Sequence, residues 1–158
     1  LGQSGLGERD VRATPLQMAM VAAAIANDGT LMQPYVVDEM FDPDGNTVSK
    51  TEPIVLSEAM STATVDALTE MMERVVTEGT GTAATVPGVR VAGKTGTAEA
   101  GQGASYPWFI GFAPVEDPQI AVAVMFEPLP AEGSSETGGR VAAPVAAQLL
   151  EGWLEARN

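Results

Sequence analysis

The chain has 158 residues, of which 45% are hydrophobic and 18% are charged, and this composition indicates a globular domain with a core of its own. Its formal net charge of −13 argues against nucleic acid and against anionic lipid as partners, because both bind clustered lysine and arginine. The chain has no cysteine and no histidine. This excludes disulfides, thiolate or imidazole zinc sites and a Ser-His-Asp triad, and we expect neither a metal nor a cofactor.

The chain begins with a glycine-rich stretch, residues 1–7, that no predicted element precedes, which suggests a piece of a longer protein. A helix is predicted next. Thr14 can cap it, a proline suits its first position, and Gln17 can complete a capping box. The helix continues to Ala26, with Gly29 as its C-terminal cap. It is apolar nearly all round, which predicts burial on most sides.

Extended structure is predicted for residues 31–37, where a proline limits the strand to a sheet edge or a strand start. An Asp-Gly turn then separates two extended runs, which predicts a hairpin of residues 35–41 with residues 47–50. The acidic residues of this region suggest a calcium site, but their spacing does not match an EF-hand loop, so we expect solvated charge. These residues are Asp38, Glu39, Asp42 and Asp44.

A second helix is predicted over residues 61–78, with Glu70 and Arg74 as a helical i,i+4 ion pair. The glycine-rich run 79–82 closes this helix. A phosphate-binding loop would have to follow a strand and open a helix, so that interpretation is rejected. The apolar stripe of the helix is formed by Val65, Leu68, Met72, Val75 and Val76.

Three strands follow with short connections, which predicts an antiparallel meander. They cover residues 89–99, 108–113 and 119–126, and a polar turn over residues 100–105 joins the first two. The loop 127–139 is long, acidic and predicted to be flexible.

The last predicted helix starts near residues 141–144 and continues to about residue 156. The expected fold class is therefore α+β, an antiparallel β-sheet with helices packed on it. No run is apolar for long enough to span a bilayer. The apolar stripe expected for the last helix is Val141, Val145, Leu149 and Trp153.

The first strand of the meander carries the candidate site. Strand alternation puts Lys94 and Gly96 on one face, and Thr95 and Thr97 on the other. A ligand that touches both Lys94 and Thr95 must lie along the strand edge, where backbone groups are free. Gly93 and Gly96 have no side chain to block that approach.

Lys-Thr-Gly is a mark of penicillin-binding proteins and serine β-lactamases, together with S-x-x-K and S-D-N. With its surrounding motifs, the chain resembles the C-terminal part of the transpeptidase domain of class B penicillin-binding proteins over essentially all 158 residues. The resemblance rests on the order and spacing of six motifs. The motifs are Gly2-Gln3, Ala13-Thr14-Pro15-Leu16-Gln17-Met18-Ala19, Ile25-Ala26-Asn27-Asp28-Gly29, Gly79-Thr80-Gly81-Thr82-Ala83-Ala84, Val91-Ala92-Gly93-Lys94-Thr95-Gly96-Thr97-Ala98-Glu99 and Trp108-Phe109-Ile110-Gly111-Phe112-Ala113-Pro114.

The resemblance implies a peptidoglycan D,D-transpeptidase whose serine forms an acyl intermediate with cell-wall stem peptides and with β-lactams. Lys94 would support the serine of S-x-N and attract the substrate carboxylate. Thr95 and Thr97 would bind that carboxylate, and the backbone N–H of Thr97 would be an oxyanion donor. Gly96 would leave room for the substrate. The parent protein is expected at the extracytoplasmic face of the bacterial membrane, anchored by a segment not present here.

The chain contains no S-x-x-K and no S-x-N. Residues 1–158 are therefore interpreted as part of a transpeptidase domain, with the nucleophile upstream, and we expect this chain alone to be inactive. Missing helices would leave apolar surface exposed, so we expect self-association or a partner that carries the remainder of the protein.

Three alternatives stay open at this stage. A serine β-lactamase shares the Lys-Thr-Gly-Thr strand, and a non-catalytic sensor or scaffold could keep the fold without the serine. A plain acidic binding domain would have no ligand along Lys94–Thr97.

Overall fold

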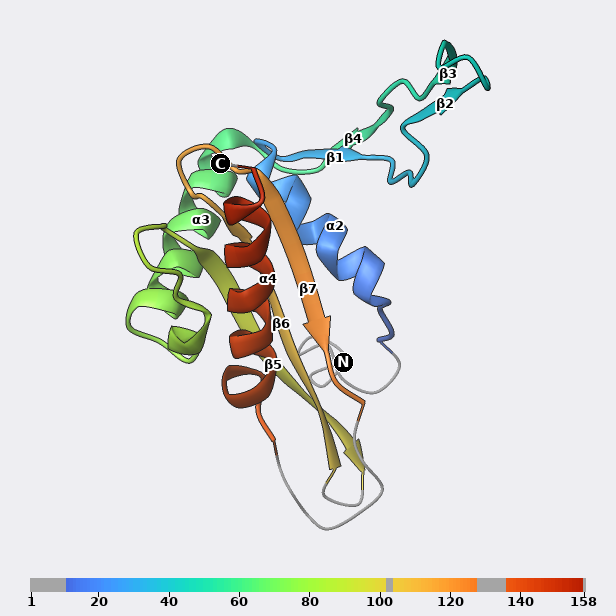
Figure 1. Cartoon of the computed structure of the whole chain (residues 1–158). Coiled ribbons are helices and arrows are strands. Elements are labelled where there is room, and N and C mark those ends of the chain that lie inside the picture. Colours follow the sequence, from blue (N-terminus) through green and yellow to red (C-terminus); the bar gives the residue numbers. More distant parts are fainter. Residues whose placement is uncertain (1–10, 102–103, 128–135, 158) are drawn as a thin grey trace.

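The computed structural model describes residues 11–101, 104–127 and 136–157 (Figure 1). Helices cover both faces of a three-stranded antiparallel sheet, which confirms the predicted α+β class. The predicted glycine-rich start, residues 1–7, lies outside the described residues. The main elements are α2 (Pro15–Ala26), α3 (Thr62–Thr77), β5 (Ala92–Gly101), β6 (Ala104–Ala113), β7 (Ile120–Met125) and α4 (Ala143–Glu155).

The sheet has the strand order β5-β6-β7, which confirms the predicted meander. Strands β5 and β6 continue further than predicted, because Glu99 pairs with Ser105 and Gly101 pairs with Ala104. Backbone pairing does not depend on side-chain polarity, so the polar residues assigned to a turn form the end of the ladder instead. The tip itself, residues 102–103, lies outside the described residues.

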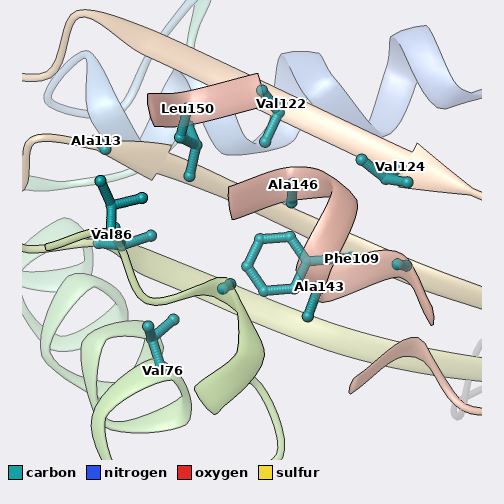
Figure 2. Close-up of a cluster of buried hydrophobic side chains, with 12 residues drawn as sticks. Val76, Val86, Phe109, Ala113, Val122, Val124, Ala143, Ala146 and Leu150 are labelled. Carbon is teal, nitrogen blue, oxygen red and sulfur yellow. The ribbon is translucent and has the colours of Figure 1, made fainter. Parts of the chain in front are cut away.

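Two apolar clusters form on opposite faces of the sheet. On one face, Phe109 of β6 belongs to the same cluster as α4, and Figure 2 shows its ring beside Ala143 and Ala146. On the other face, Phe112 packs against Ile25 of α2. Alternation along β6 separates these two phenylalanines, so a single strand serves both clusters.

The N-terminal cap of α2 has the predicted geometry. The Gln17 N–H donates to Thr14 Oγ1 at 3.2 Å, and the Thr14 N–H donates to Gln17 Oε1 at 2.8 Å, which completes the capping box. At the other end, Gly29 has a φ of +87° and its N–H donates to the Ala24 carbonyl at 2.8 Å. The predicted glycine thus has left-handed backbone after the helix, as does Asp28 before it, with a φ of +51°.

The predicted burial of α2 on most sides is wrong within this chain. Ala22 and Ile25 are buried, but Leu16 is 57% exposed and Val21 is 43% exposed. Besides the sheet, α3 and β1 also contact the helix, but these elements leave Leu16 and Val21 exposed.

The predicted stripe of α3 is confirmed, with Val65, Met72 and Val76 buried. The predicted stripe of α4 is wrong at Leu149 and Trp153, which are 50% and 42% exposed. The helix instead turns two alanines and one leucine toward the sheet, and the alanines leave room for the large Phe109 ring. The buried residues of α4 are Ala143, Ala146 and Leu150.

An arm of two successive two-stranded ribbons, defined here as residues 30–58, extends from the body (Figure 1). The predicted hairpin is confirmed as β2 (Glu39–Phe41) with β3 (Thr47–Lys50). The strand predicted over residues 31–37 is shorter, β1 (Thr30–Met32), and it pairs with β4 (Val55–Glu58), which was not predicted. All four residues of β4 are exposed, so the strand needs no alternation of apolar and polar residues by which the sequence could have predicted it.

Asp42, one of the acidic residues of the arm, stabilises the turn between β2 and β3. Asp42 Oδ1 accepts the N–H groups of Asp44 at 2.9 Å and Asn46 at 2.8 Å. The Asn46 side-chain amide also donates to Asp42, and this hydrogen bond is the main reason that the pKa of Asp42 lies below its ordinary value. Within the described ranges, no three acidic residues group as metal ligands would, and no helix is long and apolar enough to cross a membrane.

The Phe109 ring lies in a niche between two glycines. A Cβ at Gly93 would lie 2.2 Å from the ring, and one at Gly111 would lie 2.6 Å from the Ala92 carbonyl oxygen. Gly93 is therefore small because Phe109 packs against it, not because a ligand approaches there, which corrects the sequence interpretation. Only Gly96 of the predicted pair keeps an open side, with its Cβ position 3.4 Å from the Trp108 side chain.

Replacing Phe109 with alanine should destabilise the protein by about 3–5 kcal/mol, because the fully buried ring leaves a cavity that two glycines cannot fill. The matched control is Phe41→Ala in the arm, where the side chain is 61% exposed and the expected cost is under about 1 kcal/mol. Urea unfolding of both variants measures the difference. Equal costs at the two positions would contradict the role given to Phe109.

Candidate active site

Strand β5 is an edge strand, since β6 is its one neighbour in the sheet among the residues that the structure describes. Its backbone direction follows from a neighbouring hydrogen bond. The Phe126 N–H donates to the Pro107 carbonyl at 3.1 Å, so the backbone groups of Pro107 face β7 and those of Trp108 face β5. Gly96 is paired with Trp108, and its backbone groups therefore face β6. The N–H of Thr97, one residue further, points to the free edge.

Lys94 is exposed, and its ammonium lies at the same edge. Its Nζ donates to the Thr95 carbonyl at 2.6 Å. By the alternation just described, the backbone groups of Thr95 and Thr97 face the same side. A cation and an outward-facing backbone N–H therefore lie along one strand edge, where the Thr95 carbonyl already accepts a hydrogen bond from Lys94.

The two threonines lie on the opposite face from the Lys94 side chain, again as predicted. Thr95 is 9% exposed, and its hydroxyl oxygen lies 2.5 Å from that of Thr80. Thr97 is exposed, and its hydroxyl accepts the N–H of Gly138 at 3.4 Å. Each hydroxyl is thus contacted by a segment distant in sequence.

Residues 136–139 pack against the strand and hold this geometry. A Cβ at Gly138 would lie 2.1 Å from the Trp108 carbonyl oxygen and 2.5 Å from that of Gly96. The Ser105 hydroxyl donates to the Glu136 carbonyl at 2.7 Å. The predicted flexible loop 127–139 is therefore well packed over its last four residues, while residues 128–135 lie outside the described part.

Sequence reasoning assigned no site role to Thr80, Gly138 or Gly139. A Cβ at Gly139 would lie 2.2 Å from the Thr80 carbonyl oxygen, so these segments are in close contact. The available signals were the Gly-Thr-Gly-Thr run and the pair of adjacent glycines in an otherwise acidic loop. Neither signal indicates which strand the glycines contact.

Arg90, the other cation of the predicted strand, is engaged elsewhere. It forms two hydrogen bonds of 2.6 Å to Glu73 of α3 and one of 2.7 Å to Glu116 of the β6–β7 connection. The hydrogen bond from Arg90 holds the pKa of Glu73 below its ordinary value, while partial burial opposes this. Lys94, in contrast, has no carboxylate within ion-pair distance among the described residues. Its charge is therefore available to an anionic ligand.

Comparison with known proteins agrees with this geometry. The family model described as "Penicillin binding protein transpeptidase domain" matches residues 1–151. The chain is 45% identical to peptidoglycan D,D-transpeptidase PbpA of Mycolicibacterium smegmatis, over 96% of this chain and 32% of that protein. It is 39% identical to stage V sporulation protein D of Bacillus subtilis, over 89% of this chain and 22% of that protein. The chain thus spans about a third or less of these relatives.

Solved structures of penicillin-binding proteins are also similar to this chain. The crystal structure of PBPA from Mycobacterium tuberculosis superposes with a TM-score of 0.84 at 39% identity, covering 97% of this chain and 37% of that one. The penicillin G acyl-enzyme complex of the same protein gives a TM-score of 0.83, again at 39% identity, covering 97% of this chain and 34% of that one.

Gly138→Ala should destabilise the protein by about 1–3 kcal/mol, because the added methyl group meets two backbone carbonyls that cannot move aside. Gly152→Ala in α4 is the control. Nothing lies within 4 Å of its Cβ position, and the substitution should stabilise the helix by up to about 1 kcal/mol. Thermal unfolding compares the two, and a neutral Gly138→Ala would contradict the close packing.

Glu73→Gln should lower the free energy of unfolding at pH 7 by no more than about 1 kcal/mol, because the ion pair with Arg90 is partly exposed. The folded-state pKa of Glu73 is depressed, so its stabilisation is present above the ordinary value of 4.5 and is lost as the pH falls below it.

The difference from the wild-type protein should therefore shrink in urea unfolding as the pH falls below 4.5. Glu70→Gln is the control, because both side chains of the Glu70–Arg74 pair are about two-thirds exposed, at 67% and 66%. A Glu73 effect that stays constant between pH 7 and about pH 3 would contradict the assignment.

Proposed function

The chain belongs to the penicillin-binding protein transpeptidase family, and on this basis we propose that it forms the C-terminal part of a D,D-transpeptidase domain that cross-links cell-wall stem peptides. The observation that carries the proposal is the common edge of β5, where the Lys94 ammonium lies beside the outward-facing backbone groups of Thr95 and Thr97. In this proposal, residues 1–158 supply one wall of the active site.

The reaction follows from the family. A serine oxygen attacks the carbonyl carbon of the penultimate D-alanine, the peptide bond to the terminal D-alanine breaks, and that D-alanine leaves with a proton on its nitrogen. An amine from a neighbouring strand then attacks the ester and releases the serine. The serine lies outside this chain, because the chain contains no S-x-x-K. Penicillin-binding protein A of Mycobacterium tuberculosis, to which this chain is similar, forms acyl-enzyme complexes with imipenem, ceftriaxone and penicillin G.

The residues of β5 take four roles. The Lys94 ammonium attracts the terminal carboxylate of the substrate and supports proton transfer at the serine. The hydroxyls of Thr95 and Thr97 bind that carboxylate. The outward N–H of Thr97 donates to the oxyanion of the tetrahedral intermediate, and a single donor of this kind accounts for about 3 kcal/mol in other enzymes. Gly96 leaves the strand edge open for the substrate backbone.

In this proposal, the partner of this chain is the remainder of the same protein. When that remainder is absent, the chain associates with itself. The exposed apolar side chains of α2 and α4 support this, since Leu16, Val21 and Leu149 are each more than two-fifths exposed. The protein would act at the extracytoplasmic face of the bacterial membrane, where peptidoglycan is built, with its anchor in a segment outside this chain.

A fluorescent penicillin should label a polypeptide that carries the whole transpeptidase domain and should not label residues 1–158 alone. Lys94→Met should slow labelling of the whole domain by about 10²-fold, because the cation at the carboxylate and the serine is lost. Lys50→Met is the control, since Lys50 pairs with Glu39 in the arm. Intact mass spectrometry reads the acylation.

Labelling of residues 1–158 alone would contradict the proposal, because it would require a nucleophile within this chain. Equal labelling of the Lys94→Met and Lys50→Met proteins would refute the role of Lys94. Rapid hydrolysis of the penicillin, with no lasting acyl-enzyme, would instead favour a β-lactamase, and absence of labelling in the whole domain would favour a non-catalytic homologue.

A further inference from the structure

Thr80 lies in a loop whose position is set by the core. The N–H of Gly81 donates to the Val75 carbonyl of α3 at 2.9 Å, and a Cβ at Gly81 would lie 3.4 Å from the Phe109 ring. The loop therefore folds back on the last turn of α3 and on the buried ring. This brings the Thr80 hydroxyl oxygen to 2.5 Å from that of Thr95.

Two hydroxyls at this distance share one hydrogen bond, and either oxygen can be the donor. When Thr80 donates, the hydrogen of Thr95 is left for another acceptor. A carboxylate only accepts hydrogen bonds, so an anionic ligand at the β5 edge selects the arrangement in which Thr80 donates. The hydroxyl hydrogen of Thr97 is likewise left to donate, because the hydroxyl oxygen already accepts the backbone N–H of Gly138.

We propose that Thr80 is a positioning residue that turns the Thr95 hydroxyl into a hydrogen-bond donor for the carboxylate of the substrate or of a β-lactam. Thr80 does not touch the ligand and acts through Thr95. The inference rests on the proposed function, and it adds a residue from a different loop to the recognition of the carboxylate.

Gly139 completes this arrangement. Its Cβ position is 2.2 Å from the Thr80 carbonyl oxygen and 3.8 Å from the Thr95 Cγ2, so the Thr80 loop and β5 are held together from one side. The pair of hydroxyls therefore sits between a helix end, a strand and the segment before α4. Reorientation of one hydroxyl hydrogen needs no movement of these elements.

The test compares acylation of the whole transpeptidase domain by benzylpenicillin and by its methyl ester, which lacks the negative charge. Thr80→Val keeps the shape of the side chain and removes the donor. It should slow acylation by benzylpenicillin about tenfold, and the rate with the ester should change less than about twofold. Thr80→Ser should restore the wild-type rate with benzylpenicillin.

Two further variants make the result specific. Thr82→Val, in the next turn of the same loop, is the matched control and should react as the wild type does, because the hydrogen bond it makes to Thr85 uses its backbone carbonyl. In a Thr95→Val background, Thr80→Val should cause no further loss with benzylpenicillin, since Thr80 acts through the Thr95 hydroxyl.

Equal slowing of benzylpenicillin and of the ester would overturn the inference, because it would indicate a general structural role for Thr80. Additive losses in the double variant, or no loss in Thr80→Val, would also overturn it. If the wild-type domain reacts with neither compound, the proposed function itself fails, and this outcome is distinct from a change in the ratio of the two rates.

Discussion

The close contact of the Phe109 ring with Gly93 and Gly111 is the constraint on which the rest of the structure depends. Phe109 is fully buried, packs against α4, and lies next to the Gly81 loop. It is also the residue paired with Thr95 across the ladder. One side chain therefore sets the distance between β5, the helix and the loop that meets the strand. The outer edge of β5 can stay unpaired because the strand is held by its pairing with β6 and by the packing of Phe109 against one face.

Local signals in the sequence predicted much of the fold. The capping box of Thr14 and Gln17, the β2–β3 hairpin and the meander all follow from residues near one another in the chain. Strand β4 was missed because a ribbon exposed on both faces shows no alternation. The buried face of α4 was assigned wrongly because the helix is apolar on more than one face, and a packing partner decides which face is covered.

The sequence predicted the strand that carries the candidate site, but not the segments that contact this strand. Alternation and edge position gave the right faces for Lys94 and Thr95, since both depend on the strand alone. The contacts that Thr80 and Gly138 make with this strand join positions 15 and 41 residues apart. No periodic pattern encodes such a contact. The role assigned to Gly93 was wrong for the same reason, because its neighbour is a ring on another strand.

The exposed arm has a consequence for how motion is distributed in the molecule. Two-stranded ribbons with both faces in solvent bury little apolar surface, and each of the four residues of β3 and of β4 is exposed. Such a segment opens at a low free energy compared with global unfolding, so its amide hydrogens exchange with solvent early. Its two strands β1 and β4 leave the body side by side, and the core clusters include no residue of the arm. Since β1 contacts α2, the β2–β3 hairpin is the part of the arm that can open and close as a separate unit while the ladder of β5 and β6 stays intact.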